Sequence, residues 1–439
     1  MTVHAHSHLL RMPIEILFLI LEQCDSNTTS IARLAQTCHL FHDISAKFLY
    51  KHLVLGNTQT KPFRRTIKSN PSIAKLVKSL TIHHHYTEPD NPADFRPRFL
   101  EASSPTIAHL TDLETLILKG CGPDSPHGDI ASRRHHKRLY LAAYGKLHRL
   151  FLKSISSGML SKLKTLTLNL SDSRLWHCEI EPFIFHPTLE RLSILGAAVT
   201  FLQFLGFNHS TNLKSLELLC CDISPGTLNA ILSVPKALQY LVFKGATRTL
   251  PVLPAYTRPE RQPYVDAIAQ QAESLTTLDL DFWLDLDDEH PPVDLTALVN
   301  LRDLAIRPRI LDGVTYGQDE DEVEERPLEE NRLPQSLTHL TLIDVDEPIP
   351  TLIQSMLVKI LDQWSDEGDL PNLKAVEFVN VQPYGRMDDV PMDGNLPVRW
   401  RELGGGRALH WIVGARSMIC RGIFRFRRVR RVRRRCVHI

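Results

Sequence analysis

Clustered histidines are the residues of this chain whose type and spacing come nearest to a metal site. His83, His84 and His85 stand in a row, and His135 and His136 form a second group. In a strand, alternate members of the triplet would share one face, and imidazoles placed in this way can bind zinc. No third ligand type stands at a supporting spacing around either group, so we expect no metal site.

Other residue patterns also lack the partners that chemistry requires. Cys220 and Cys221 are adjacent in the sequence, and adjacent cysteines form a disulfide only with strained geometry. The glycines at 404–406 are not followed by the Lys-Ser/Thr pair of a phosphate-binding loop. Neither a Gly-x-Ser-x-Gly turn nor a His-Glu-x-x-His pair occurs. We therefore predict a non-catalytic protein that uses no cofactor and no metal.

Composition predicts a protein of the cytoplasm, the nucleus or both. Eight cysteines among 439 residues are too few for a disulfide scaffold, and none forms a C-x-x-C pair, so we expect reduced thiols. The longest apolar run near the start, 16–21, is far shorter than the roughly 18 residues of a membrane span. We expect no membrane association.

Two segments carry unbalanced charge although the formal net charge is only +1. Eight acidic residues at 318–331 predict a solvated acidic loop at about 317–331. Ten arginines and no acidic residue follow Ala415, so the C-terminal segment 400–439 is expected to end in a disordered tail. Such a tail can neutralise phosphates or act as a nuclear localisation signal, which makes a nucleic-acid-associated protein an alternative function.

The first sixty residues read as three short helices. Pro13 and Glu15 suit the first turn of a helix, and Thr29 or Ser30 can cap a second one. Apolar residues recur at helical spacing in each segment: Ile16, Leu17, Ile20, Leu21 and Cys24; Ile31, Leu34, Ala35 and Cys38; Phe41, Ile44 and Phe48. Three helices of this size make a very small core that usually depends on a partner.

The order and spacing of these residues resemble an F-box over about residues 8–50, with Met12 where that family usually has leucine. We assign the module to residues 8–52. The resemblance, to fungal-like F-box proteins with leucine-rich repeats, implies binding to a Skp-type adaptor and through it to a cullin–RING core. The adaptor-binding residues that it implies are Leu10, Pro13, Ile16, Leu17, Ile20, Leu34 and Cys38. Ile16 and Ile20 would fit the helical core as well as the interface.

The rest of the chain repeats the pattern L-x-x-L-x-L, which is typical of leucine-rich repeats. Copies begin at Leu113, Leu163, Leu189, Leu213, Leu238, Leu275, Leu301, Leu337 and Leu373, with a possible first copy at Val77. Starts from Leu163 to Leu238 are 24 to 26 residues apart, and longer gaps imply insertions. We expect an outer helix over 131–158, another helix over 352–364 and a proline-stiffened insertion over 251–263.

This pattern predicts an α/β solenoid over residues 53–399, a curved horseshoe whose parallel strands line the concave side. Residues between the leucines would face outward there and bind a protein substrate. The candidates are Thr167, Ser193, Glu217, Tyr240, Lys244, Asp279, Asp281, Asp303, Arg307 and Glu377. The C-terminal half of this set is acidic, so we expect a basic ligand and salt-sensitive binding.

The resemblance implies that the chain is the substrate-recognition subunit of an SCF-type ubiquitin ligase, which directs a protein to ubiquitin-dependent degradation. Such a subunit performs no chemistry and raises the effective concentration of its substrate near the conjugating enzyme. A repeat scaffold that binds partners without assembling a ligase is the second alternative to it, beside the nucleic-acid-associated protein.

Overall fold

The computed structural model describes residues 12–23, 28–56, 58–84, 98–120, 130–169, 176–177, 179–199, 208–245, 260–282, 291–312, 332–343, 370–379, 398–401 and 408–410. Several predictions fall outside these residues. They concern Leu10, Cys24, the helix over 352–364, the acidic loop, the arginine-rich end and most of the proline-rich insertion.

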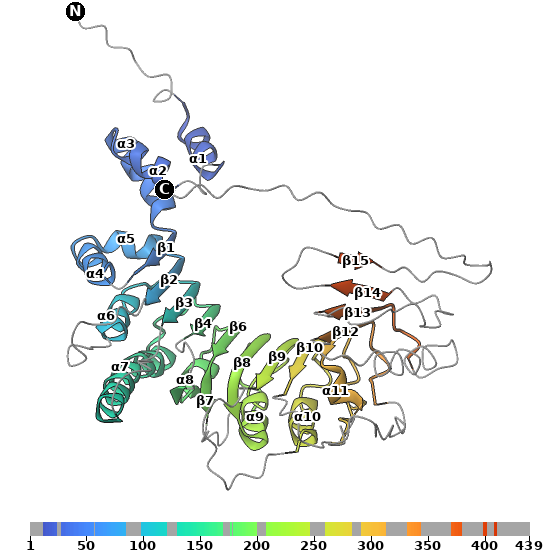
Figure 1. Ribbon diagram of the computed structural model, residues 1–439. Coiled ribbons are helices and arrows are strands. Elements are labelled where there is room, and N and C mark those ends of the chain that lie inside the picture. Colours follow the sequence, from blue (N-terminus) through green and yellow to red (C-terminus); the bar gives the residue numbers. More distant parts are fainter. Residues whose placement is uncertain are drawn as a thin grey trace, which may run out of the picture.

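One open, curved sheet organises the molecule (Figure 1). Its strands are β1 (His52–Leu55), β2 (Ser79–His84), β3 (Thr115–Gly120), β4 (Thr165–Asn169), β6 (Arg191–Leu195), β8 (Ser215–Ile223), β9 (Tyr240–Gly245), β10 (Thr277–Asp281), β11 (Asp303–Ile306), β12 (His339–Ile343), β13 (Ala375–Val379), β14 (Val398–Arg401) and β15 (Ala408–His410). Neighbours along this order pair in parallel up to β14, and β15 pairs antiparallel with β14. Two short strands, β5 (Trp176–His177) and β7 (Ala197–Val199), form a second layer with the end of β8.

Helices lie along the outer side of the arc (Figure 1). They are α4 (Thr60–Ser69), α5 (Pro71–Leu76), α6 (Arg98–Ile107), α7 (Ile130–Ser157), α8 (Glu181–Ile184), α9 (Pro225–Leu232), α10 (Gln262–Ala269) and α11 (Pro308–Asp312). The helix predicted over 131–158 is therefore present as α7. An open parallel sheet with helices on one side is the arrangement of an α/β solenoid. None of the described helices combines the length and the apolar composition needed to cross a membrane.

Every L-x-x-L-x-L copy runs into a strand of this sheet. In β4, Leu166 and Leu168 are fully buried beneath the sheet, whereas Thr165 and Thr167 keep partial exposure on the opposite face. The same alternation continues from strand to strand, since successive side chains of a strand point to opposite faces. The leucines join into one continuous core that extends from Leu55 in β1 to Val376 in β13.

A shared carbonyl marks the start of each strand. The carbonyl of Lys51 accepts hydrogen bonds from the amides of Lys78 and Ser79, both at 2.9 Å. The same arrangement recurs at each following strand, up to the Thr338 carbonyl, which accepts from Lys374 and Ala375. Strand β1 belongs to this series although no L-x-x-L-x-L copy was assigned to it.

Polar side chains just before the first leucine of a copy tie it to the preceding one. The hydroxyl of Thr188 donates to the Leu163 carbonyl at 2.7 Å, and Asn300 Nδ2 donates to the Glu273 carbonyl at 2.8 Å. Asn212, Ser274, Ser336 and Asn372 make equivalent bonds. These bonds pair loop carbonyls that the strands leave free, and they are partly buried at Thr188, Ser274 and Ser336.

Three helices precede the sheet: α1 (Ile14–Gln23), α2 (Thr28–Ala35) and α3 (His39–Leu49). Their core is separate from that of the sheet, and its buried residues are Leu17, Leu21, Ile31, Phe41 and Ile44. Helix α2 already begins at Thr28, so Thr29 and Ser30 lie within it and neither is the cap that we predicted. Only Tyr50 and Lys51 separate α3 from β1, which places the boundary between the two parts at residue 51.

Candidate protein-binding surfaces

The register of the strands brings the predicted substrate-binding residues onto the concave face. Thr167, Ser193 and Glu217 occupy one row across β4, β6 and β8, and Asp279 and Glu377 continue the row on β10 and β13. Neighbouring rows contain Tyr240 with Asp303, and Lys244 with Asp281, while Arg307 directly follows β11. The predicted set therefore shares one face but spans most of the sheet.

Ionisable residues from β8 to β12 form what we term the concave patch: Glu217, Tyr240, Lys244, Asp279, Asp281, Asp303, Arg307 and His339. Ion pairs link its members across neighbouring strands. Lys244 Nζ lies 2.8 Å from Asp279 Oδ2, and Arg307 Nε lies 3.0 Å from Asp281 Oδ1. His339 Nδ1 lies 2.9 Å from Asp303 Oδ1, and the hydroxyl of Thr277 donates to Asp303 Oδ2 at 3.4 Å.

These pairs revise the expectation of a plainly acidic surface. Two of the aspartates have a basic partner, and His339, absent from the predicted set, faces the third. Glu217 and Glu377 form no ion pair with any described residue, so the negative excess of this face concentrates on them. The sequence pattern placed each residue on the face but could not show which charges neutralise one another.

Tyr240 lies at the middle of the concave patch, with 36 % of its surface exposed. Partial burial raises the pKa of its phenol, the carboxylates of Glu217 and Asp279 raise it further, and Lys244 opposes them. The phenol therefore stays protonated and can donate a hydrogen bond. An exposed tyrosine amid charged groups is a common energetic centre of protein interfaces, because it offers apolar area and a polar tip together.

A second surface lies on the helical module, where apolar side chains face solvent. The exposed ones are Met12, Ile14, Ile16, Leu19, Ile20 and Leu40, and Leu19 is 55 % exposed. Ile16, Leu19 and Ile20 share one side of α1, since residues three and four apart are neighbours on a helix. We term Met12, Ile16, Leu19 and Ile20 the α1 apolar stripe.

The predicted adaptor-binding residues divide between this stripe and the small core. Pro13, Ile16 and Ile20 are exposed, which resolves the earlier ambiguity over the two isoleucines. Leu17 is only 1 % exposed and lies at the centre of the core, so it cannot serve as a contact residue. Leu34 and Cys38 are half-buried against the same core. Leu19, which the pattern did not single out, is the most exposed member of the stripe.

Candidate chemical sites stay dispersed in the part of the chain that the structure describes. There, no three His, Cys, Asp or Glu side chains approach closely enough to hold a metal ion. Cys38, Cys220 and Cys221 are free thiols, and burial raises the pKa of Cys221 to about 12, so this thiol is not a nucleophile. What the described residues do offer is two surfaces suited to binding other proteins.

No protein-family model and no curated protein matches this chain. The resemblance to F-box proteins accordingly rests on the residues of the helical module themselves.

Proposed function

We propose that the protein is the substrate-recognition subunit of an SCF-type ubiquitin ligase. In this proposal the helical module is an F-box that binds a Skp-type adaptor through the α1 apolar stripe. The curved sheet is a leucine-rich repeat horseshoe that holds a protein substrate on its concave face. The observation that carries the proposal is the exposed apolar stripe on a module whose own core has five buried apolar residues among those that the structure describes.

A core of this size leaves much apolar surface in water. Burying a fully exposed isoleucine or leucine contributes roughly 1.5–3 kcal/mol, and burying one that is already partly covered contributes about half of that. Ile16, Leu19 and Ile20 expose 42 %, 55 % and 39 % of their surface, although neighbouring positions on the same helix are buried. A partner that covers the stripe would remove this cost, as is usual for small modules that lean on a partner.

The concave patch supports the substrate side of the proposal. The unpaired carboxylate of Glu217 and the ring of Tyr240 suit a basic segment of a protein, which would lie beside the buried Oδ1 of Asp279. That oxygen has no hydrogen-bond partner among the described residues. No step in this function requires chemistry from the chain itself, because holding a substrate near a charged conjugating enzyme raises its effective concentration.

Adaptor binding by a stripe variant tests the proposal. The double variant Ile16→Asp, Ile20→Asp places two charges on the stripe and leaves the buried Leu17 and Leu21 in place. We expect it to weaken binding to a purified Skp-type adaptor by at least ten-fold, since burying the remaining exposed surface of the two isoleucines contributes about 1–2 kcal/mol and each aspartate adds the cost of burying a charge. Isothermal titration calorimetry on the full chain measures the change.

The matched control is Val54→Asp, Val299→Asp, which makes the same charge change at positions that are 64 % and 58 % exposed on the sheet and its loops. We expect this control to bind the adaptor like the natural chain. If the natural chain does not bind the adaptor at all, the proposal fails and the scaffold without ligase assembly takes its place. Equal losses in both variants would show that the stripe is not the contact.

A further inference from the structure

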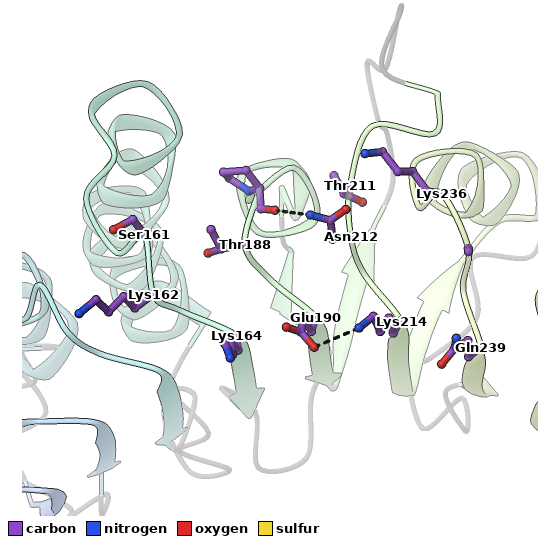
Figure 2. Close-up of a pocket in the computed structure, with 12 residues that line it drawn as sticks. Ser161, Lys162, Lys164, Thr188, Glu190, Thr211, Asn212, Lys214, Lys236 and Gln239 are labelled. Carbon is purple, nitrogen blue, oxygen red and sulfur yellow. Dashed lines mark hydrogen bonds and ion pairs between the residues drawn. The ribbon is translucent and has the colours of Figure 1, made fainter.

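A groove runs along the edge of the sheet at which the strands begin. It has a volume of about 520 Å³ and crosses the starts of β4, β6, β8 and β9 (Figure 2). Four loops line it, at 161–164, 187–190, 211–214 and 236–239. We term it the rim groove. Its residues belong neither to the α1 apolar stripe nor to the concave patch.

Lysines dominate the charge of the rim groove. Lys162, Lys164, Lys214 and Lys236 line it, and Glu190 is the single acidic lining residue. Lys214 Nζ lies 3.5 Å from Glu190 Oε2, and Lys162 forms an ion pair with Asp112 outside the groove. Lys164 and Lys236 are exposed and form no ion pair with any described residue. The groove therefore keeps a positive excess that an anionic ligand would neutralise.

Beside the positive charge of the groove, a buried hydroxyl without a partner is a second, independent observation that points to a ligand. Thr211 lines the groove with 3 % of its surface exposed, and its Oγ1 has no hydrogen-bond partner among the described residues. A hydroxyl can donate one hydrogen bond and accept two, and burying it unpaired is unfavourable. In Figure 2 Thr211 lies beside Asn212, between Thr188 and Lys236. Asn212 Nδ2 already donates to the Pro187 carbonyl at 3.3 Å, so the Thr211 hydroxyl is the group still to be satisfied.

We propose that the rim groove binds an extended acidic segment of a protein, with carboxylates at the lysines and its main chain at Thr211. Three strand spacings separate β4 from β9, about 15 Å, which about five residues of extended chain span. The basic residues of the lining are lysines, point charges that suit separate carboxylates, and it lacks the arginine forks that favour phosphate. It also lacks aromatic side chains on which nucleic-acid bases would stack.

The inference does not depend on adaptor binding, and peptide binding tests it directly. The probe is a fluorescein-labelled decapeptide of alternating glutamate and alanine, followed by fluorescence polarisation with the full chain at low salt. We expect Lys164→Glu, Lys236→Glu to raise the Kd at least ten-fold. The control Lys61→Glu, Lys68→Glu makes the same charge change on exposed lysines of α4 and should alter the Kd less than two-fold. All proteins compared contain the same arginine-rich end, so a difference in Kd between them comes from the exchanged lysines.

Thr211→Val separates a binding role from a structural one. It removes the unpaired hydroxyl and keeps the shape, so we expect a higher melting temperature together with at least three-fold weaker peptide binding. An unchanged Kd in this variant, or equal losses in the two lysine variants, would overturn the proposal. So would a phosphoserine version of the peptide, or a ten-nucleotide RNA, that binds more than ten-fold tighter than the glutamate peptide.

Discussion

The hydrogen bonds of Gln271 allow a test of how one repeat, a strand with the helix or loop that follows it, is held to the next. Its side chain is 3 % exposed and joins the end of α10 to the loop that precedes β9. Gln271 Oε1 accepts from the Leu238 amide at 2.9 Å, and Nε2 donates to the carbonyls of Leu232 at 2.8 Å and Pro235 at 3.0 Å. The substitution Gln271→Leu keeps the volume but leaves these backbone groups buried without this partner.

The magnitude follows from the groups left unpaired. A buried backbone group without a partner costs roughly 1–3 kcal/mol. The Leu238 amide loses its acceptor and the Leu232 carbonyl loses its donor, while the Pro235 carbonyl also contacts His209 Nδ1 at 3.4 Å. The apolar leucine recovers part of this cost, so we expect the segment to lose about 3 kcal/mol, a change of roughly 150-fold in its opening equilibrium.

Amide hydrogen exchange at Gln239 and Tyr240 measures this opening. Both amides donate to the Lys214 carbonyl and neither bonds to Gln271, so their exchange reports the segment as a whole. A local measurement is needed because the stability of repeated units is a sum of local terms. The control is Gln270→Leu, since Gln270 is exposed and water can replace its bonds to Asn229 and Ala267. Comparable acceleration in both variants, or unchanged exchange in Gln271→Leu, would refute the reasoning.

Two further predictions concern α7 and the loop that precedes β6. Gly145→Ala should raise stability by about 0.5–1 kcal/mol because a Cβ there meets nothing within 4 Å, whereas Gly158→Ala should lower it by about 1 kcal/mol because Gly158 has a φ of +67°. Thermal unfolding of both variants checks this, and shifts of the same sign would contradict it. Burial lowers the pKa of His186 to about 4, so the unfolded chain takes up this proton first as the pH falls below about 6.5. Urea titrations should therefore show that His186→Gln loses about 2 kcal/mol less stability than the natural chain between pH 7 and pH 5, and parallel losses would argue against it.

Spacing in the sequence was sufficient to place ten of the strands but not β1, β5, β7, β14 or β15. The residues Tyr50, Leu53 and Leu55 have the spacing of an L-x-x-L-x-L copy, but an aromatic residue stands in the first position. Residues two apart in the pattern fix which side chains share a face, and this physical rule located the concave residues correctly. In helix α1 the spacing was not sufficient. Apolar residues recur there at helical spacing on both the exposed and the buried side, and the spacing does not show which of them face solvent.

The L-x-x-L-x-L pattern could not predict which side chains contact each other across neighbouring strands. The pairing of Lys244 with Asp279 joins residues 35 positions apart, and only the register of β9 and β10 brings them together. The lysines of the rim groove do leave a signal in the sequence. A lysine directly follows the first leucine at Lys164, Lys214 and Lys374, and equivalent positions stack along one edge of a parallel sheet.

The two-residue junction between α3 and β1 holds the helical module in a fixed orientation relative to the sheet, which a long flexible linker would not do. Phe48 and Leu49 pack on the small core, whereas Tyr50 and Leu53 already pack on the large one, so the change of core takes place within a few residues. Inserting one residue after Leu49 with the helix continued would turn the α1 apolar stripe by about 100° around the axis of α3. A partner bound to the stripe is therefore held in one orientation relative to the concave face. The insertion or deletion of a single residue at the junction would change that orientation.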